Sequence, residues 1–146
     1  MGILETLSQR WGENNEPFLI RGDQGITFSD IHSSELVDLT DVHPGDVVAL
    51  IGDFEPVSIS NFLRLIDLGA IIVPLTTDTT HQQDYLFEAA NVDVVIQGSS
   101  IIRRQVSERA SELKSLADKG RAGLVLFSSG TTGKPKAILH DLERFL

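Results

Sequence analysis

The stretch "PGDVVALIGDFEPVSISNFLRLIDLGAIIVPL" (Pro44–Leu75) has the residue pattern of a strand, a helix and a second strand, which indicates the fold class of this chain. It contains "DVVALIG" (Asp46–Gly52), a continuous apolar run typical of strands that are buried on both faces of a parallel sheet. A helix is predicted next, because apolar residues recur at the i, i+3, i+4, i+7 spacing of one helix face. These residues are Ile59, Phe62, Leu63 and Ile66.

The end of this helix and the start of the next strand also follow from the stretch. Gly69 is placed to end the helix, since glycine adopts the left-handed conformation of a helix C-terminus without strain. "AIIV" (Ala70–Val73) predicts the following strand, and Pro74, which lacks a backbone N–H, is expected to end it. Strand, helix and strand in this order predict a right-handed parallel βαβ unit.

The same alternation continues downstream. The patterns predict a helix around residues 81–90, a strand at "VDVVI" (Val92–Ile96), a polar helix around residues 107–119 and a strand at "AGLVLF" (Ala122–Phe127). The order from residue 46 is then βαβαβαβ, which indicates an α/β protein with a mostly parallel sheet and flanking helices. The polar stretches "TDTTHQQ" (Thr77–Gln83) and "QGSSIIRRQ" (Gln97–Gln105) are interpreted as loops or a weak linker.

The residues before this unit predict smaller elements. Residues 2–13 have the apolar spacing of a short amphipathic helix, and "PFLIRGDQGITF" (Pro17–Phe28) has the pattern of a hairpin. Ser29 is expected to cap a helix that runs through Leu36 and Val37.

We therefore expect one domain in two parts. Residues 1–43 form the helix and hairpin, and residues 44–146 form the α/β unit, which ends in a Gly/Ser/Thr/Lys loop.

Composition limits the function. The chain has 146 residues, a net charge of −9 and no cysteine, so it can hold neither disulfides nor cysteine-ligated metals. An acidic surface repels phosphate backbones, so no nucleic-acid partner is expected. The four histidines lack the spacing of zinc ligands, and no metal site is expected from them.

No membrane partner is expected either. The most apolar stretch, "FLRLIDLGAIIVPL" (Phe62–Leu75), contains Arg64 and Asp67 and is too short to cross a bilayer. "MGILET" fits the loose N-myristoylation pattern, but an ordinary first turn of helix is the favoured interpretation. A cytoplasmic protein is expected.

The loop "SSGTTGKPK" carries the functional prediction. It follows the last apolar strand, and ligands of parallel sheets bind at the carboxyl ends of the strands. Glycines let the backbone approach a ligand closely, and hydroxyls, backbone N–H groups and two cations suit anionic oxygens. The predicted phosphate-binding residues are Ser128, Ser129, Gly130, Thr131, Thr132, Gly133, Lys134 and Lys136. The alternative is a flexible surface loop that is rich in turn-forming residues.

Two common nucleotide patterns fail on this loop. In the P-loop pattern G-x-x-x-x-G-K-[ST], Ser128 would stand at the first glycine and Pro135 at the Mg²⁺-binding hydroxyl residue. The dinucleotide pattern G-x-G-x-x-G fails because no third glycine precedes Gly130 and Gly133 at the required spacing. A small nucleotide hydrolase is therefore the less favoured alternative.

The ten residues "SSGTTGKPKA" resemble the signature loop of the adenylate-forming superfamily, which includes acyl-CoA synthetases, peptide-synthetase adenylation domains and luciferases. The departure is Ala137, where the family usually has glycine. The stretch Pro44–Leu75 is similar to the early βαβ unit of the family, and "ITFSDI" (Ile26–Ile31) and "ILHDL" (Ile138–Leu142) also fit. The resemblance covers roughly residues 26–142.

The resemblance implies that a carboxylate attacks the α-phosphate of ATP to give an acyl-adenylate, after which a thiol of CoA or of phosphopantetheine takes the acyl group. The loop, with Mg²⁺, would hold the β- and γ-phosphates, and Lys136 matches the usual basic residue of the family better than Lys134. No catalytic residue is assigned in this chain. The adenine, ribose and catalytic-lysine sites of the family would lie beyond residue 146, so the chain is expected to be an N-terminal fragment that is inactive alone.

Three further expectations accompany this interpretation. The alternative to an enzyme fragment is a non-catalytic interaction module that forms homo-oligomers through an exposed apolar face. Trp11 and Tyr85 are expected to be packing residues rather than ligand stackers, and His140 is expected to be a surface or capping residue.

Overall fold

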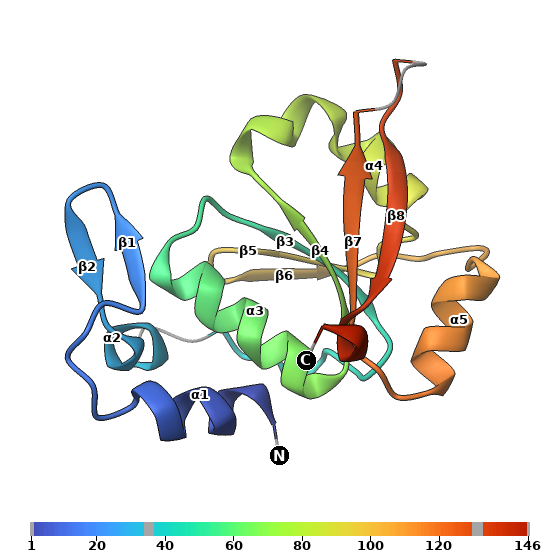
Figure 1. The fold of residues 1–146 in the computed structure, drawn as a ribbon. Coiled ribbons are helices and arrows are strands. Elements are labelled where there is room, and N and C mark those ends of the chain that lie inside the picture. The colour runs from blue at the N-terminus through green and yellow to red at the C-terminus, as the bar shows by residue number, and fades with distance from the viewer. Residues whose placement is uncertain (1, 34–36, 130–132, 146) are drawn as a thin grey trace.

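The computed structural model describes residues 2–33, 37–129 and 133–145 of the chain. A six-stranded sheet in the order β6-β5-β3-β4-β7-β8 forms its centre (Figure 1). The strands are β3 (Val47–Ile51), β4 (Ile71–Leu75), β5 (Val94–Gln97), β6 (Ser100–Arg103), β7 (Gly123–Ser128) and β8 (Lys136–Asp141). β5, β3, β4 and β7 are parallel, whereas β6 and β8 are antiparallel edge strands. The expected α/β class and mostly parallel sheet are confirmed.

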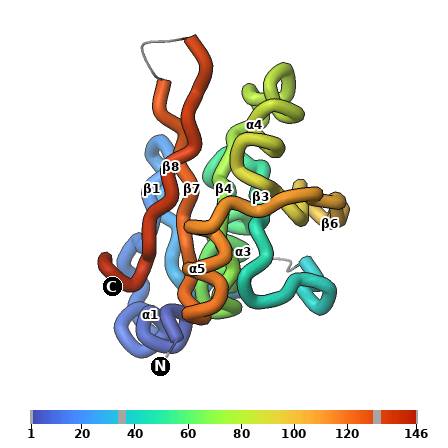
Figure 2. The backbone as a smooth tube through the Cα atoms, turned by 90° about the vertical axis from the view of Figure 1, so that its right-hand side faces the viewer, coloured from blue at the N-terminus to red at the C-terminus, as the bar shows by residue number. Residues whose placement is uncertain are grey.

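Helices cover both faces of this sheet. Helix α3 (Pro56–Leu68) packs on one face, and α4 (Gln83–Ala89) and α5 (Ser111–Asp118) pack on the other. Figure 2 shows the β7–β8 hairpin rising beyond the rest of the sheet. The ends of β7 and β8 that flank the predicted loop therefore lie at this protruding end of the hairpin.

The N-terminal elements lie beside α3 rather than on the sheet. They are α1 (Ile3–Trp11), the hairpin of β1 (Leu19–Arg21) and β2 (Gln24–Ile26), and α2 (Phe28–His32). Both α1 and α2 contact α3 (Figure 1). The backbone N–H groups of Ile3 and Leu4 donate to the Asp67 carboxylate of α3, at 2.5 and 3.2 Å, which holds the start of α1 in place.

The continuous apolar run of β3 is explained by burial on both faces of the sheet, as expected, because all of its residues are buried. Val47, Ala49 and Ile51 belong to the cluster packed with α4 and α5, while Val48 and Leu50 belong to the cluster packed with α3. A strand between two helix layers needs apolar side chains on both faces, which removes the alternation of a half-exposed strand.

Helix α3 begins and ends as expected. Pro56 is its first residue, where the missing N–H costs no intrahelical hydrogen bond. Gly69 follows Leu68 with φ of 81°, and its N–H donates to the Ile66 carbonyl oxygen at 3.0 Å. A residue with a Cβ would be strained at this φ, so glycine is needed here.

The prediction that Pro74 ends its strand is wrong, since β4 continues to Leu75. The Ile71 N–H donates toward β3, to the Asp46 carbonyl oxygen, at 2.9 Å. Backbone N–H groups alternate in direction along a strand, so the missing N–H of Pro74 faces β7. The β4–β7 register covers Ile71 and Ile72 only, and Pro74 therefore removes no ladder hydrogen bond.

The cap of α2 also differs from the prediction. Thr27 caps this helix and Ser29 lies inside it, because the Thr27 hydroxyl accepts from the Asp30 N–H while the Asp30 carboxylate accepts from the Thr27 N–H. The helix ends at His32. Leu36, which was expected to lie in it, is outside the described residues, and Val37 lies beyond the helix.

The two stretches interpreted as loops contain regular structure. Thr77–Gln82 forms a 3-10 helix that leads into α4. Residues 97–105 contain edge strand β6, whose hairpin with β5 turns at Gly98, with φ of 58°. The Gly-Ser pair at residues 98–99 is a known hairpin signal between strands, so this element could have been found from the sequence.

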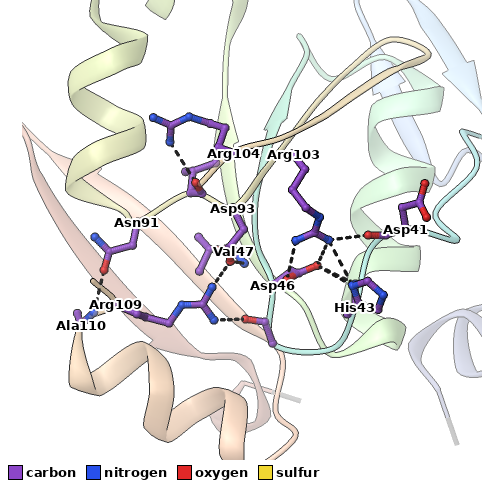
Figure 3. A network of polar contacts seen from close by, with 12 residues as sticks. Asp41, His43, Asp46, Val47, Asn91, Asp93, Arg103, Arg104, Arg109 and Ala110 are labelled. Atoms are coloured by element: carbon purple, nitrogen blue, oxygen red, sulfur yellow. Dashed lines mark hydrogen bonds and ion pairs between the residues drawn. The ribbon is translucent and has the colours of Figure 1, made fainter. Parts of the chain in front are cut away.

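Helix α5 begins at Ser111 rather than near residue 107. The preceding segment is held by contacts with distant residues: Ala110 N–H donates to the Asn91 side chain at 2.8 Å, and Arg109 forms an ion pair with Asp93 (Figure 3). These contacts keep the segment from continuing the helix toward its N-terminus.

Aspartates precede two of the parallel strands and bind arginines from the β6–α5 segment (Figure 3). Asp46 precedes β3 and pairs with Arg103 at 2.8 Å. Burial acts to raise the pKa of Asp46, but hydrogen bonds from Arg103 and from the His43 N–H outweigh it and hold that pKa below its usual value. Asp93 precedes β5, pairs with Arg109 and accepts from the Val47 N–H at 2.8 Å. These ion pairs fix the amino ends of the strands.

Candidate functional site

The predicted loop lies between β7 and β8 in the chain, and its described residues follow the carboxyl end of the parallel strand β7 (Figure 1). Pairing runs from Gly123 opposite Asp141 to Ser128 opposite Lys136, so the hairpin is paired up to the base of the loop. The structure describes Ser129 and residues 133–135 of the turn. The predicted site residues Gly130, Thr131 and Thr132 lie outside the described residues.

Gly133 shows why the loop needs glycine on its return toward β8. Its φ is 85°, a conformation that residues with a Cβ rarely adopt. A Cβ built at this position would meet no atom within 4 Å, so the demand comes from the backbone conformation and not from crowding.

The two lysines of the loop extend in different directions. Ser128 and Lys136 are directly opposed across the hairpin, so their side chains share a face. This is the face of Leu126, which lines a groove together with Phe62 of α3. The ammonium of Lys134 instead lies 5.4 Å from the ring centroid of Tyr85, on α4. Positive charge is thus present on two sides of the base of the loop.

These cations are available for an anion. Within residues 2–33, 37–129 and 133–145, no carboxylate forms an ion pair with Lys134 or Lys136. Both lysine residues are exposed. Two of the four lysines of an acidic chain therefore lie unpaired within three residues of each other.

Tyr85 contacts the loop, a role that the sequence reasoning missed. Its hydroxyl donates to the Pro135 carbonyl oxygen at 2.8 Å, and the residue is 37% exposed. Tyr85 was expected to be a packing residue, but its side chain is partly exposed and also contacts the loop. No local pattern could have shown this contact, because fifty positions separate the two residues.

Hydrogen bonds join the residues that follow the carboxyl ends of β3 and β4. Asp53, just beyond β3, accepts from the Thr77 hydroxyl at 2.6 Å and from the Thr77 N–H at 3.0 Å. These two hydrogen bonds, led by that of the hydroxyl, hold the pKa of Asp53 below its usual value. The connections after β3 and β4 lead to opposite faces of the sheet, and this bridge joins them.

An apolar groove of about 430 Å³ lies between α3 and the sheet, below the loop. Its lining includes Phe54, Ile59, Phe62, Leu124 and Leu126. Phe54 is 73% exposed and has φ of 55°, an unusual conformation for an aromatic residue. Because α3 is displaced from β7 and β8, this part of the sheet keeps an exposed apolar face.

The described part of the chain has neither a cluster of metal-ligand side chains nor a membrane-spanning helix. No group of three or more histidine, aspartate or glutamate side chains there is arranged to hold a metal ion. No helix there has both the length and the apolar character needed to cross a membrane.

Comparisons with known proteins find two relatives that are similar in sequence to this chain. No protein-family model matches it. The 2-succinylbenzoate–CoA ligase of Listeria monocytogenes serotype 4b (strain F2365) is 28% identical over 115 residues, which cover 70% of this chain and 24% of the ligase. Tyrocidine synthase 3 of Brevibacillus parabrevis is 23% identical over 145 residues, covering 83% of this chain and 2% of the synthase.

Solved structures share the fold. The N-terminal subdomain of NpsA from Klebsiella oxytoca, in complex with 3-hydroxybenzoyl-AMSN, matches with a TM-score of 0.62 and 22% identity, covering 94% of this chain and 39% of that one. The o-succinylbenzoate CoA synthetase of Bacillus subtilis, in complex with the acyl-adenylate intermediate OSB-AMP, matches with a TM-score of 0.61 and 21% identity, covering 94% and 41%. The chain is thus similar in sequence to part of a CoA ligase and to part of a peptide synthase, and in fold to the N-terminal subdomain of NpsA and to o-succinylbenzoate CoA synthetase.

The similarity to adenylate-forming enzymes confirms the resemblance that the loop and the βαβ unit suggested. The chain spans about a quarter of the ligase and about two fifths of the solved chains that it matches. The phosphate-binding roles of individual loop residues remain predictions.

Proposed function

We propose that this chain supplies the polyphosphate-binding part of an ATP-dependent enzyme that activates a carboxylic acid as an acyl-adenylate. The observation that supports it most is the loop itself. Two unpaired lysines and a positive-φ glycine lie at the carboxyl end of a parallel strand. The relatives named above, a CoA ligase and a structure that holds an acyl-adenylate intermediate, fit this assignment.

The roles of the residues follow from their chemistry. Lys136 and Lys134 would neutralise charge that develops on pyrophosphate as the bond to the α-phosphate breaks. The hydroxyls of Ser128 and Ser129 would donate to phosphate oxygens, and Gly133 would let the backbone approach them. The same proposal gives Gly130 a backbone role and Thr131 and Thr132 hydroxyl roles, as the family signature implies.

The remaining reactants belong to the same proposal. Mg²⁺ would enter with ATP, since it binds phosphate oxygens and retains several of its waters. The acceptor of the acyl group would be the thiol of CoA or of phosphopantetheine. A cytoplasmic location, where ATP is available, completes the proposal.

Titration of the 146-residue chain with Mg-ATP tests the phosphate site. In two-dimensional NMR spectra, we expect the backbone amide resonances of the described loop residues to shift. These residues are Ser128, Ser129, Gly133, Lys134 and Lys136. Tripolyphosphate should reproduce these shifts and adenosine should not, because the loop offers charge rather than a base-stacking surface. Shifts confined to the arginine cluster around Arg103 and Arg109, with the loop unchanged, would show that the assignment is wrong.

A second candidate function is self-association, in which a second copy covers the exposed sheet face. Leu126 and Ile138 are opposed across the hairpin on this face and are 42% and 45% exposed. The Phe145 ring lies beside that of His140, which is opposed to Leu124 near the start of β7. β8 is also an edge strand whose outer side pairs with no other described strand. An exposed apolar patch beside an open strand edge favours pairing with another chain.

Sedimentation velocity over a range of concentrations tests this second candidate. We expect concentration-dependent dimers that Leu126→Lys, which adds charge at the centre of the patch, shifts toward monomer. Glu143→Lys, at a nearby exposed position outside the apolar patch, is the control. A monomer at all concentrations in the unmodified chain would exclude self-association through this face.

A further inference from the structure

Helix α4 and the return of the loop meet at one side chain. The Tyr85 hydroxyl donates to the Pro135 carbonyl oxygen at 2.8 Å. The aromatic ring of the same residue lies under the Lys134 ammonium, 5.4 Å from its centroid, which is within the range of a cation–π interaction. Tyr85 therefore contacts two consecutive loop residues through two different parts of its side chain.

These contacts act on the part of the loop that sets its direction. Pro135 has a fixed φ, and its carbonyl is the last before the paired strand β8 begins at Lys136. A hydrogen bond to that carbonyl restricts the remaining backbone freedom of the return. Lys134 has a long, flexible stem, and the ring reduces the number of positions that its charge can occupy.

The neighbouring polar side chains do not share this role. In the connection before α4, the hydroxyls of Thr79 and Thr80 donate to carbonyl oxygens of their own turn, both at 2.7 Å. The His81 ring nitrogen Nδ1 lies 3.1 Å from the Asp78 carbonyl oxygen. Within the described residues of this connection and of α4, Tyr85 alone has a hydrogen bond to the loop.

We propose that Tyr85 is a positioning residue of the phosphate loop. It holds the return of the loop against α4 and keeps the Lys134 ammonium beside the place where polyphosphate oxygens bind. The inference rests on the proposed function for its ligand, but the holding of the loop can be measured without any ligand.

Three variants separate the parts of the contact. Tyr85→Phe removes the hydroxyl and keeps the ring, whereas Tyr85→Leu removes both. Thr79→Val is the matched control, because it deletes a hydroxyl-to-carbonyl hydrogen bond in the same connection without touching the loop. Urea denaturation of each variant shows whether the global stability is retained.

The first measurement is amide hydrogen exchange in the ligand-free chain. We expect the amides of Gly133, Lys134 and Lys136 to exchange about 2- to 10-fold faster in Tyr85→Phe, the effect of losing one hydrogen bond. The Thr79→Val variant should match the unmodified chain at these residues. Equal exchange in Tyr85→Phe and the unmodified chain would overturn the inference and leave the proposed phosphate site intact.

The second measurement is the dissociation constant for tripolyphosphate by calorimetry. We expect it to rise about 2- to 10-fold in Tyr85→Phe, and further in Tyr85→Leu, since the ring contact with Lys134 is then also lost. In a Lys134→Gln background, Tyr85→Leu should cost less than in the unmodified chain, because the two residues act together. Additive effects would overturn the part of the inference that concerns Lys134.

A spectroscopic measurement follows the contact directly. Tyr85 is the single tyrosine of the chain, so 3-fluorotyrosine labels α4 at one position. Its fluorine resonance should shift on saturation with tripolyphosphate, and this shift should be lost in Lys134→Gln. Faster loop exchange in Tyr85→Phe together with no tripolyphosphate binding in any variant would keep the role of Tyr85 in holding the loop and remove the proposed function.

Discussion

Replacing Arg109 with methionine is expected to lower the free energy of unfolding by about 3–5 kcal/mol, the usual cost of removing one partner of a buried ion pair. Asp93 is 8% exposed and would lose its charged partner, keeping the Val47 N–H as a donor at 2.8 Å. Arg109 also donates to the Gly45 carbonyl oxygen at 3.1 Å, and its ion pair with Asp93 is drawn in Figure 3. The substitution therefore leaves a buried carboxylate without its cation and removes a hydrogen bond to the turn that precedes β3.

Urea denaturation followed by circular dichroism measures this effect. Arg144→Met is the control, because Arg144 is 82% exposed and lies 3.9 Å from Asp141, so its loss should change stability by less than about 0.5 kcal/mol. Adding Asp93→Asn to Arg109→Met should recover part of the loss, since no unpaired buried charge then remains. A loss in Arg109→Met no greater than in Arg144→Met would mean that the ion pair does not hold the amino ends of the strands together.

Replacing both loop lysines, in Lys134→Gln/Lys136→Gln, is expected to weaken the binding of tripolyphosphate about 100-fold. Each substitution removes a charge-assisted hydrogen bond worth about 1.5–3 kcal/mol, which corresponds to about tenfold or more in the dissociation constant. Calorimetric titration of both proteins at the same ionic strength measures the change.

The chain offers a matched control for this experiment. Lys114→Gln/Lys119→Gln changes the net charge by the same amount at α5. Charges of α5 that lie farther than about 8 Å from the ligand are screened at physiological ionic strength, so we expect less than about a threefold change. Similar losses in the two double variants would show that overall charge, and not the loop, attracts the anion.

Much of the fold could be predicted because it depends on local patterns. The apolar run of β3, the helical spacing in α3 and the glycine at residue 69 each follow from the surroundings of a few neighbouring residues. The cap at Thr27 could also have been read from the sequence, since Asp30 completes a capping box with it. The edge strand β6 could likewise have been predicted from the Gly-Ser turn that joins it to β5, although it has only four residues.

Other features depend on partners that are distant in the sequence. Pro74 can lie within β4 because β7 pairs with β4 only at Ile71 and Ile72. Helix α5 starts late because Arg109 is bound by Asp93. Neither outcome can be inferred from local propensity, since a strand register and an ion pair are set by the packing of separate elements.

In the candidate site, too, some features follow from local sequence and others depend on tertiary contacts. The sequence alone determined that a parallel α/β sheet precedes a loop of glycines, hydroxyl residues and lysines, because strand patterns and loop chemistry are local properties. The packing of separate elements places Lys136 on the same face as Ser128, sets Lys134 over the Tyr85 ring, and brings the Tyr85 hydroxyl to the Pro135 carbonyl oxygen. The physical reason is that the direction of a side chain depends on strand register and on helix packing, which bring together residues fifty positions apart.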